Sequence, residues 1–203
     1  MDAFGTILFM LAGLWLFIPA FTPNVGAVLV GGGTPVDFGR SWKGKRILGD
    51  GKTWRGFIGG GLFGLLFGLL VMGAAFGADN LGIGDPSGIV MVDMFGYTGF
   101  WTGVCISLSL SFGALLGDMA GSFVKRRMGL ERGQKAPILD QFDFLIGAFL
   151  LTAVFNWEWL YNTYLSMDEW HILALFLLLI VTLILHRAMN IIGYRMGKKK
   201  EPW

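Results

Sequence analysis

Five stretches of the chain are almost wholly apolar, and the polar positions are concentrated between them. Each stretch, with its flanks, is close to the roughly 20 residues that an α-helix needs to cross about 30 Å of hydrocarbon. The pattern therefore predicts an all-α integral membrane protein in which residues 1–203 form a single transmembrane domain. The five predicted transmembrane helices cover about residues 3–21, 57–78, 100–116, 144–160 and 170–186.

The basic residues are distributed unevenly along the chain. All 16 lysines and arginines lie within residues 40–55, 125–135 and 187–200, whereas the other two segments between spans carry acids instead. Basic residues are retained on the cytoplasmic side of a membrane. This distribution predicts a multi-pass protein of the cell membrane with its N-terminus outside and its C-terminus in the cytoplasm. Two large cytoplasmic loops are expected, at residues 22–56 and 117–143.

Composition narrows the class further. Of the 203 residues, 54% are hydrophobic and only 15% are charged, with a formal net charge of +2. A soluble domain usually carries about a quarter charged residues. The composition therefore excludes a disordered chain, a coiled coil and a nucleic-acid-binding surface protein, and the lipid bilayer is the expected surrounding. The one cysteine excludes a disulfide framework and a cysteine zinc site.

Glycine is abundant, and the second predicted span carries it at a regular spacing. Gly56, Gly60, Gly64 and Gly68 recur every four residues, which places them on one face of a helix. Small residues at this spacing let two membrane helices approach closely. The face is interpreted as a packing seam within the bundle, and a homodimer through the same face is the alternative.

Three aspartates stand at the ends of neighbouring predicted spans. Asp118 follows the third span, while Asp140 and Asp143 follow Pro137, a residue suited to a first helical turn. Their spacing of three places both on one helix face. The helix dipole alone could explain acids at a helix start. Because their neighbours are apolar, however, we expect these costly ionisable groups to be functional, holding one or two Mg²⁺ ions beside phosphate oxygens.

Basic and small residues accompany these acids in both predicted loops. Glycines let backbone amides approach a phosphate, and cationic side chains bind its oxygens. A P-loop is excluded, because Arg46 stands where its first glycine is required. Simple glycine turns, acids that balance basic neighbours, and the positive-inside signal are the alternative explanations. The candidates for substrate binding in these loops are Asp50, Lys52, Thr53, Arg55 and Arg126. The cations expected to bind phosphate oxygens in the second loop are Lys125, Arg126, Arg127, Arg132 and Lys135.

At the second loop the sequence resembles a known signature. The residues Gly117, Asp118, Ser122, Lys125, Arg126, Asp140 and Asp143 are similar to the pattern of the CTP-dependent phosphatidate cytidylyltransferases. Two departures stand out, since residues 134–138 replace a Gly-His-Gly-Gly segment and Gln141 replaces an arginine. The bacterial and eukaryotic members are therefore not the best match.

A longer similarity links the chain to the archaeal CDP-archaeol synthases. It is carried by Pro19-Ala20 with Asn24, by residues 31–39 with Asp37, by residues 48–56 and by residues 136–143. The resemblance implies a five-span, Mg²⁺-dependent enzyme that uses CTP and 2,3-bis-O-geranylgeranylglycerol 1-phosphate to make CDP-archaeol and pyrophosphate. It also implies that Asn24, Asp37 and Ser122 contact the substrates.

Together these observations predict one site. Asp118, Asp140 and Asp143 are expected to hold the metal and, with Lys125, to act in catalysis. A small carrier or channel for phosphorylated metabolites or Mg²⁺ is the alternative. It is disfavoured because the acids gather at one membrane face, whereas a transport path needs polar groups across the full depth.

Overall fold

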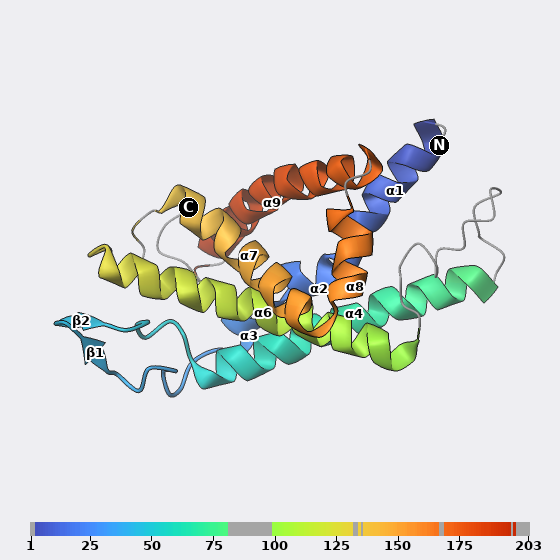
Figure 1. Cartoon of the computed structure of the whole chain (residues 1–203). Helices are drawn as coiled ribbons and strands as arrows, with labels where there is room; N and C mark the ends of the chain where they lie inside the picture. The colour runs from blue at the N-terminus through green and yellow to red at the C-terminus, as the bar shows by residue number, and fades with distance from the viewer. Residues whose placement is uncertain are drawn as a thin grey trace.

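The structure, a computed structural model, describes residues 3–80, 99–131, 134, 136–166, 169–195 and 197. These residues are mostly helical, and a two-stranded hairpin, β1 (Ser41–Trp42) and β2 (Lys45–Arg46), protrudes at one end (Figure 1). The helices are α1 (Ala3–Leu16), α2 (Ile18–Phe21), α3 (Pro23–Val30), α4 (Trp54–Asn80), α6 (Phe100–Arg127), α7 (Pro137–Phe155), α8 (Trp157–Leu160), the π-helical η1 (Tyr161–Leu165) and α9 (Glu169–Arg195).

Three of the described helices are long and apolar enough to cross a membrane. They are the segments Trp54–Gly77, Phe100–Arg127 and Pro137–Phe155, and a fourth span results if the bent pair Met10–Leu16 and Ile18–Val30 is taken as one. Helix α9 contributes a shorter apolar segment, His171–Leu185. The prediction of a mostly helical membrane protein with several spans is confirmed. The count of five spans remains a prediction.

The first loop begins later in the structure than the predicted residue 22. The helical path bends by 47° between Leu16 and Ile18, and instead of ending at residue 21 it continues through α2 and α3 to Val30. Pro19 and Pro23 stand in the first turns of α2 and α3. Proline has no amide hydrogen to donate, so it starts a new helix more readily than it continues one. Helical structure therefore occupies about the first quarter of the segment predicted as loop 22–56.

The second predicted loop is mostly helical. Helix α6 runs to Arg127, eleven residues past the predicted end of its span, and α7 already begins at Pro137. Hydropathy measures the depth of a residue in lipid, whereas a helix ends only where its backbone hydrogen bonds stop. A helix that leaves the membrane becomes polar without unwinding. At its other end α7 stops at Phe155, before the predicted residue 160.

Glycines bring α6 and α7 into backbone contact. A Cβ atom added to Gly117 would lie 2.1 Å from the carbonyl oxygen of Asp143, and one added to Gly147 would lie 2.4 Å from the carbonyl oxygen of Gly113. No side chain fits between these two backbones. This contact places the polar end of α6 directly beside the first turns of α7.

The glycine face of α4 is also filled from within the chain. A Cβ atom at Gly60 would lie 2.6 Å from the carbonyl oxygen of Pro23, and atoms at Gly64 and Gly68 would collide with the hydroxyl groups of Ser111 and Ser107. The prediction of a packing seam is confirmed. The alternative, a homodimer through this face, is not supported, because α2, α3 and α6 already cover it.

Candidate active site

Asp37 organises the segment between α3 and α4. Its carboxylate accepts hydrogen bonds from the amides of Gly39, Leu48 and Gly49, each at 3.0 Å, and from Arg46 Nη2 at 2.8 Å. Burial alone would raise the pKa of Asp37, but the bonds from Arg46 and these amides outweigh it and hold the pKa well below its usual range. With its side chain fully enclosed, Asp37 shapes the loop from inside.

Arg127 fastens the hairpin to the end of α6. Its guanidinium donates to the carbonyl oxygens of Trp42 at 2.5 Å, Lys45 at 3.1 Å and Arg46 at 2.7 Å. The ring of Trp42 stacks on Phe123 with centroids 5.8 Å apart. Sequence reasoning did not assign this role, because a run of basic residues after a span also reads as a topology signal. The aromatic Trp42 in a basic loop is the only hint that the sequence carries.

Thr53 connects this loop to α4. Its Oγ1 accepts the amide hydrogen of Gly56 at 3.1 Å and that of Gly32 at 3.3 Å. The first of these bonds is a helix N-cap, which satisfies one of the free amides at a helix start. Thr53 is buried, while the neighbouring Arg55 is exposed and lies beside Gly33. The capped turn holds residues 52–55 in place at the start of α4.

Two lysine–aspartate pairs join three elements next to this turn. Lys52, just before α4, donates to Oδ2 of Asp118 on α6. Lys125 on α6 donates to Oδ1 of Asp140 on α7 at 2.5 Å. All four side chains are about three-quarters buried. Asp140 also accepts the amide hydrogen of Ala136 at 3.0 Å, which fixes it in the first turn of α7.

Asp143 completes the cluster one turn further along α7. It is buried, its Oδ1 accepts the amide hydrogen of Phe144 at 2.7 Å, and its Oδ2 packs against Gly121 of α6. Its carboxylate interacts electrostatically with Asp118, Lys125 and Lys52. The structure therefore gathers the three predicted aspartates and two of the predicted lysines. We call these five residues the carboxylate–lysine cluster.

The cluster does not form a ready-made metal centre. Within the described ranges, no three histidine, cysteine or acidic side chains surround one point. The oxygen ligands nevertheless suit Mg²⁺, which prefers carboxylates together with substrate phosphates. On Asp118 and Asp140 a lysine ammonium group occupies the place that a cation would take. The donor set therefore fits a divalent ion once the lysines move aside.

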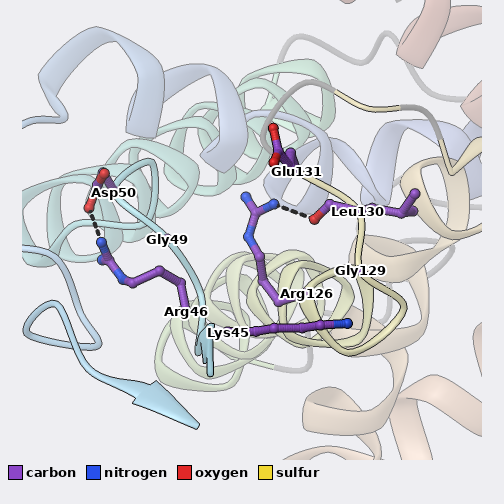
Figure 2. A pocket seen from close by; sticks show the side chains of 8 residues that line it. All are labelled: Lys45, Arg46, Gly49, Asp50, Arg126, Gly129, Leu130 and Glu131. Atoms are coloured by element: carbon purple, nitrogen blue, oxygen red, sulfur yellow. Dashed lines mark hydrogen bonds and ion pairs between the residues drawn. The ribbon is translucent and has the colours of Figure 1, made fainter. Parts of the chain in front are cut away.

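A pocket of about 480 Å³ lies beside the cluster, between the hairpin loop and the end of α6 (Figure 2). Arg126 crosses it, donating to the carbonyl oxygen of Leu130 at 2.6 Å, while Asp50 pairs with Arg46 at 2.6 Å. Glycine is required at residue 49, where φ is +99° and a Cβ atom would lie 3.2 Å from Arg126 Nη2. The pocket is lined by Lys45, Arg46, Gly49, Asp50, Arg126, Gly129, Leu130 and Glu131.

The remaining two candidates lie on helices of the same bundle. Ser122 is buried one turn beyond Asp118 on α6, and Asn24 is half-buried in the first turn of α3. Neither side chain forms a hydrogen bond within the described part of the chain. Both are therefore available to a ligand, and nothing in the bundle fixes what they bind. Of the cations expected in the second loop, Arg132 and Lys135 lie outside the described residues.

A bundle of membrane-spanning helices with a cluster of acids and lysines at one end defines a membrane-embedded enzyme rather than a transport path. Comparison with known proteins identifies the family. The model of the family described as "CarS-like: CDP-archaeol synthase" matches residues 6–203. The chain belongs to the CDP-archaeol synthase family.

Individual relatives agree with this assignment. A CDP-archaeol synthase of Archaeoglobus fulgidus is 42% identical over 96% of this chain and 98% of its own length. One of Methanospirillum hungatei JF-1 is 44% identical over 92% of this chain and 99% of its own. A solved structure, described as an intramembrane enzyme for archaeal membrane lipids biosynthesis, matches with a TM-score of 0.60 and 36% identity. That match covers 88% of this chain and 92% of the other.

The resemblance seen in the sequence is thereby confirmed. The family consists of enzymes, cytidylyltransferases of lipid biosynthesis, and the alternative of a carrier or channel is not supported.

Proposed function

We propose that the chain transfers CMP from CTP to 2,3-bis-O-geranylgeranylglycerol 1-phosphate, releasing pyrophosphate and forming CDP-archaeol. The observation that carries the proposal is the carboxylate–lysine cluster, found in a chain that resembles CDP-archaeol synthases over nearly its whole length. A site for two phosphorylated substrates needs cations for the phosphates and ligands for a metal. The cluster supplies both kinds of group.

In the proposed reaction an oxygen of the lipid phosphate attacks the α-phosphorus of CTP in line. A P–O bond forms there, and the bond from the α-phosphorus to the α,β-bridging oxygen breaks. That oxygen leaves with its electron pair as part of pyrophosphate. A phosphate monoester is already an adequate nucleophile, so the chain need not supply a strong base. Its task is to position two anions and to compensate their charge.

Each member of the cluster has a role in this proposal. Asp118, Asp140 and Asp143 would hold Mg²⁺, which when bound neutralises phosphate charge and polarises the phosphoryl group. Lys125 and Lys52 bind phosphate oxygens. Because these side chains come from α6, α7 and the start of α4, the site depends on the packing of all three elements.

The neighbouring pocket is proposed to receive the nucleotide. Asp50 and Arg126 line it, while Asp37 acts indirectly by shaping the loop and Thr53 by capping α4. Exposed Arg55 is proposed to bind a phosphate. Asn24, Ser122 and neighbouring backbone groups are proposed as further contacts to the substrates.

We propose that this site faces the cytoplasm in a five-span protein of the cell membrane, with the N-terminus outside and residues 1–203 forming one catalytic domain. The distribution of basic residues supports the orientation. CTP is dissolved in water and the isoprenoid chains are not. A site at the ends of membrane helices suits both substrates.

The test uses purified protein in detergent with CTP labelled at the α-phosphate, Mg²⁺ and one of two lipids. Label is expected in the organic phase with 2,3-bis-O-geranylgeranylglycerol 1-phosphate, and phosphatidic acid serves as the comparison lipid. Transfer to both lipids would keep the reaction but widen its specificity. Absence of transfer to either lipid by intact protein would contradict the proposed function.

A further inference from the structure

The two lysines of the cluster neutralise the carboxylates that the proposed function assigns to the metal. Lys52 pairs with Asp118, and Lys125 pairs with Asp140. We propose that Lys52 and Lys125 act as internal counter-ions, which block the binding of a divalent cation until the phosphates of a nucleoside triphosphate bind their ammonium groups. The inference rests on the proposed function and deepens it, because it states how the metal and the nucleotide depend on each other.

Electrostatics favours joint binding of the two ligands. A divalent cation that binds alone must displace both ammonium groups, which leaves two cations unpaired beside it in a site that is about three-quarters buried. A triphosphate that binds alone brings its charges against unscreened carboxylates. Charges in such surroundings interact far more strongly than in water. Only when both ligands enter does every charged group gain an opposite partner.

The position of the lysines allows this exchange. Lys52 follows the pocket residue Asp50 by two positions, and Lys125 directly precedes the pocket residue Arg126. Each lysine is therefore close along the chain to a residue that lines the proposed nucleotide pocket, while its ammonium group is paired with a carboxylate. An ammonium group on a four-carbon chain can turn from one partner to another, which a rigid guanidinium fork does less readily.

Asp143 differs from the other two aspartates in this respect. None of the lysines that the structure describes lies at ion-pair distance from it, and its carboxylate is fixed by the amide of Phe144 and by Gly121. It is therefore the invariant side of the site, whereas Asp118 and Asp140 change partners. Both changes of partner involve lysines, so removal of the two ammonium groups should open the site permanently.

The experiment measures Mn²⁺ binding without nucleotide, using the loss of the free-ion signal in electron paramagnetic resonance. The double variant Lys52→Met/Lys125→Met is expected to bind Mn²⁺ with a Kd at least tenfold lower than that of the wild-type protein. Lys52→Arg/Lys125→Arg keeps the charges and should bind as weakly as wild type. Lys43→Met, which removes an exposed charge at the hairpin tip, is the matched control and should change nothing.

Adding Asp118→Asn to the double variant Lys52→Met/Lys125→Met should remove the gain in Mn²⁺ affinity, which would assign this gain to the cluster. Size-exclusion profiles and the single variants Lys52→Met and Lys125→Met guard against a folding defect. Equal Mn²⁺ affinity of the wild-type protein and the double variant Lys52→Met/Lys125→Met would overturn the inference. If the same wild-type preparation still transfers label from CTP to lipid, the proposed function survives that outcome; if it transfers none, the proposed function fails independently.

Discussion

The contact between α6 and α7 predicts that one added methyl group will disable the site. In Gly117→Ala the new Cβ atom would lie 2.1 Å from the carbonyl oxygen of Asp143, and ordinary contacts begin at 3.4 Å. The two helices must therefore separate locally by roughly 1.3 Å. Because both sides of the contact are backbone, no side-chain rotation can relieve it. Asp118 would move away from Asp140 and Asp143 by a similar amount.

A displacement of about 1 Å at a site of this kind costs on the order of 100-fold in rate. Transfer of label from CTP into lipid is therefore expected to fall by about that factor in Gly117→Ala. The matched control is Gly73→Ala on α4, since a Cβ atom there meets nothing within 4 Å. The control should turn over like the wild-type protein. Near-normal turnover of Gly117→Ala in folded protein would refute the claim that this contact sets the geometry of the cluster.

Four further outcomes are expected. Asp140→Asn should lose lipid labelling while eluting normally in detergent, because the amide cannot replace an anionic metal ligand. Arg127→Met should raise the KM for CTP several-fold and speed proteolysis of residues 31–53, since three hydrogen bonds hold the hairpin to α6. Arg55→Ala should raise the KM for CTP or for the lipid phosphate. The pKa of Asp37 is lower in the folded than in the unfolded chain, so the ionised carboxylate stabilises the fold. This stabilisation is complete above about pH 5 and declines as the pH falls through about 4 and below. The thermal unfolding temperature of the wild-type protein should show this decline, and that of Asp37→Asn should not.

Each of these has an outcome that contradicts it. Near-full turnover of Asp140→Asn would exclude this residue as a metal ligand. An unchanged cleavage rate in Arg127→Met would show that the hairpin is held by other contacts. Unchanged saturation curves for both substrates would place Arg55 outside the site. If the wild-type protein and Asp37→Asn lost thermal stability equally as the pH falls, ionised Asp37 would not be what stabilises the loop.

The sequence predicted the class of fold well and the helix ends poorly. Runs of apolar residues located the membrane parts of α4, α6 and α7, because burial in lipid is a property of composition. The extension of α6 to Arg127 was read as loop, because polarity was taken to mean the end of a helix. The first helical turn at Pro137 was predicted from the sequence and is confirmed, although the apolar span was expected to begin only at residue 144. The bend lies between Leu16 and Ile18, close to Pro19, and only the structure shows that helix continues beyond it as far as Val30.

The candidate site was predicted in its residues but not in its arrangement. A spacing of three placed Asp140 and Asp143 on one face, and the structure turns both toward α6. The pairing of Lys52 with Asp118 joins residues 66 positions apart, and no local pattern encodes such a contact. The enclosure of Asp37 was hidden for a similar reason, because most of its donors are backbone amides, which look alike in any sequence.

The length of α6 has a consequence for where the two substrates meet. At 1.5 Å per residue its 28 residues extend about 42 Å, whereas the hydrocarbon layer is about 30 Å thick. A single rigid rod therefore passes from lipid into water, and Asp118 lies two to three turns from its polar end. Height above the bilayer and facing direction are coupled along such a rod, because each residue adds 1.5 Å and a turn of about 100°. Inserting one residue before Asp118 would raise the carboxylate by only about 1.5 Å but would turn it about 100° away from α7. The number of residues in α6 that precede Asp118 therefore sets both the height of this carboxylate relative to the bilayer and the direction in which it points.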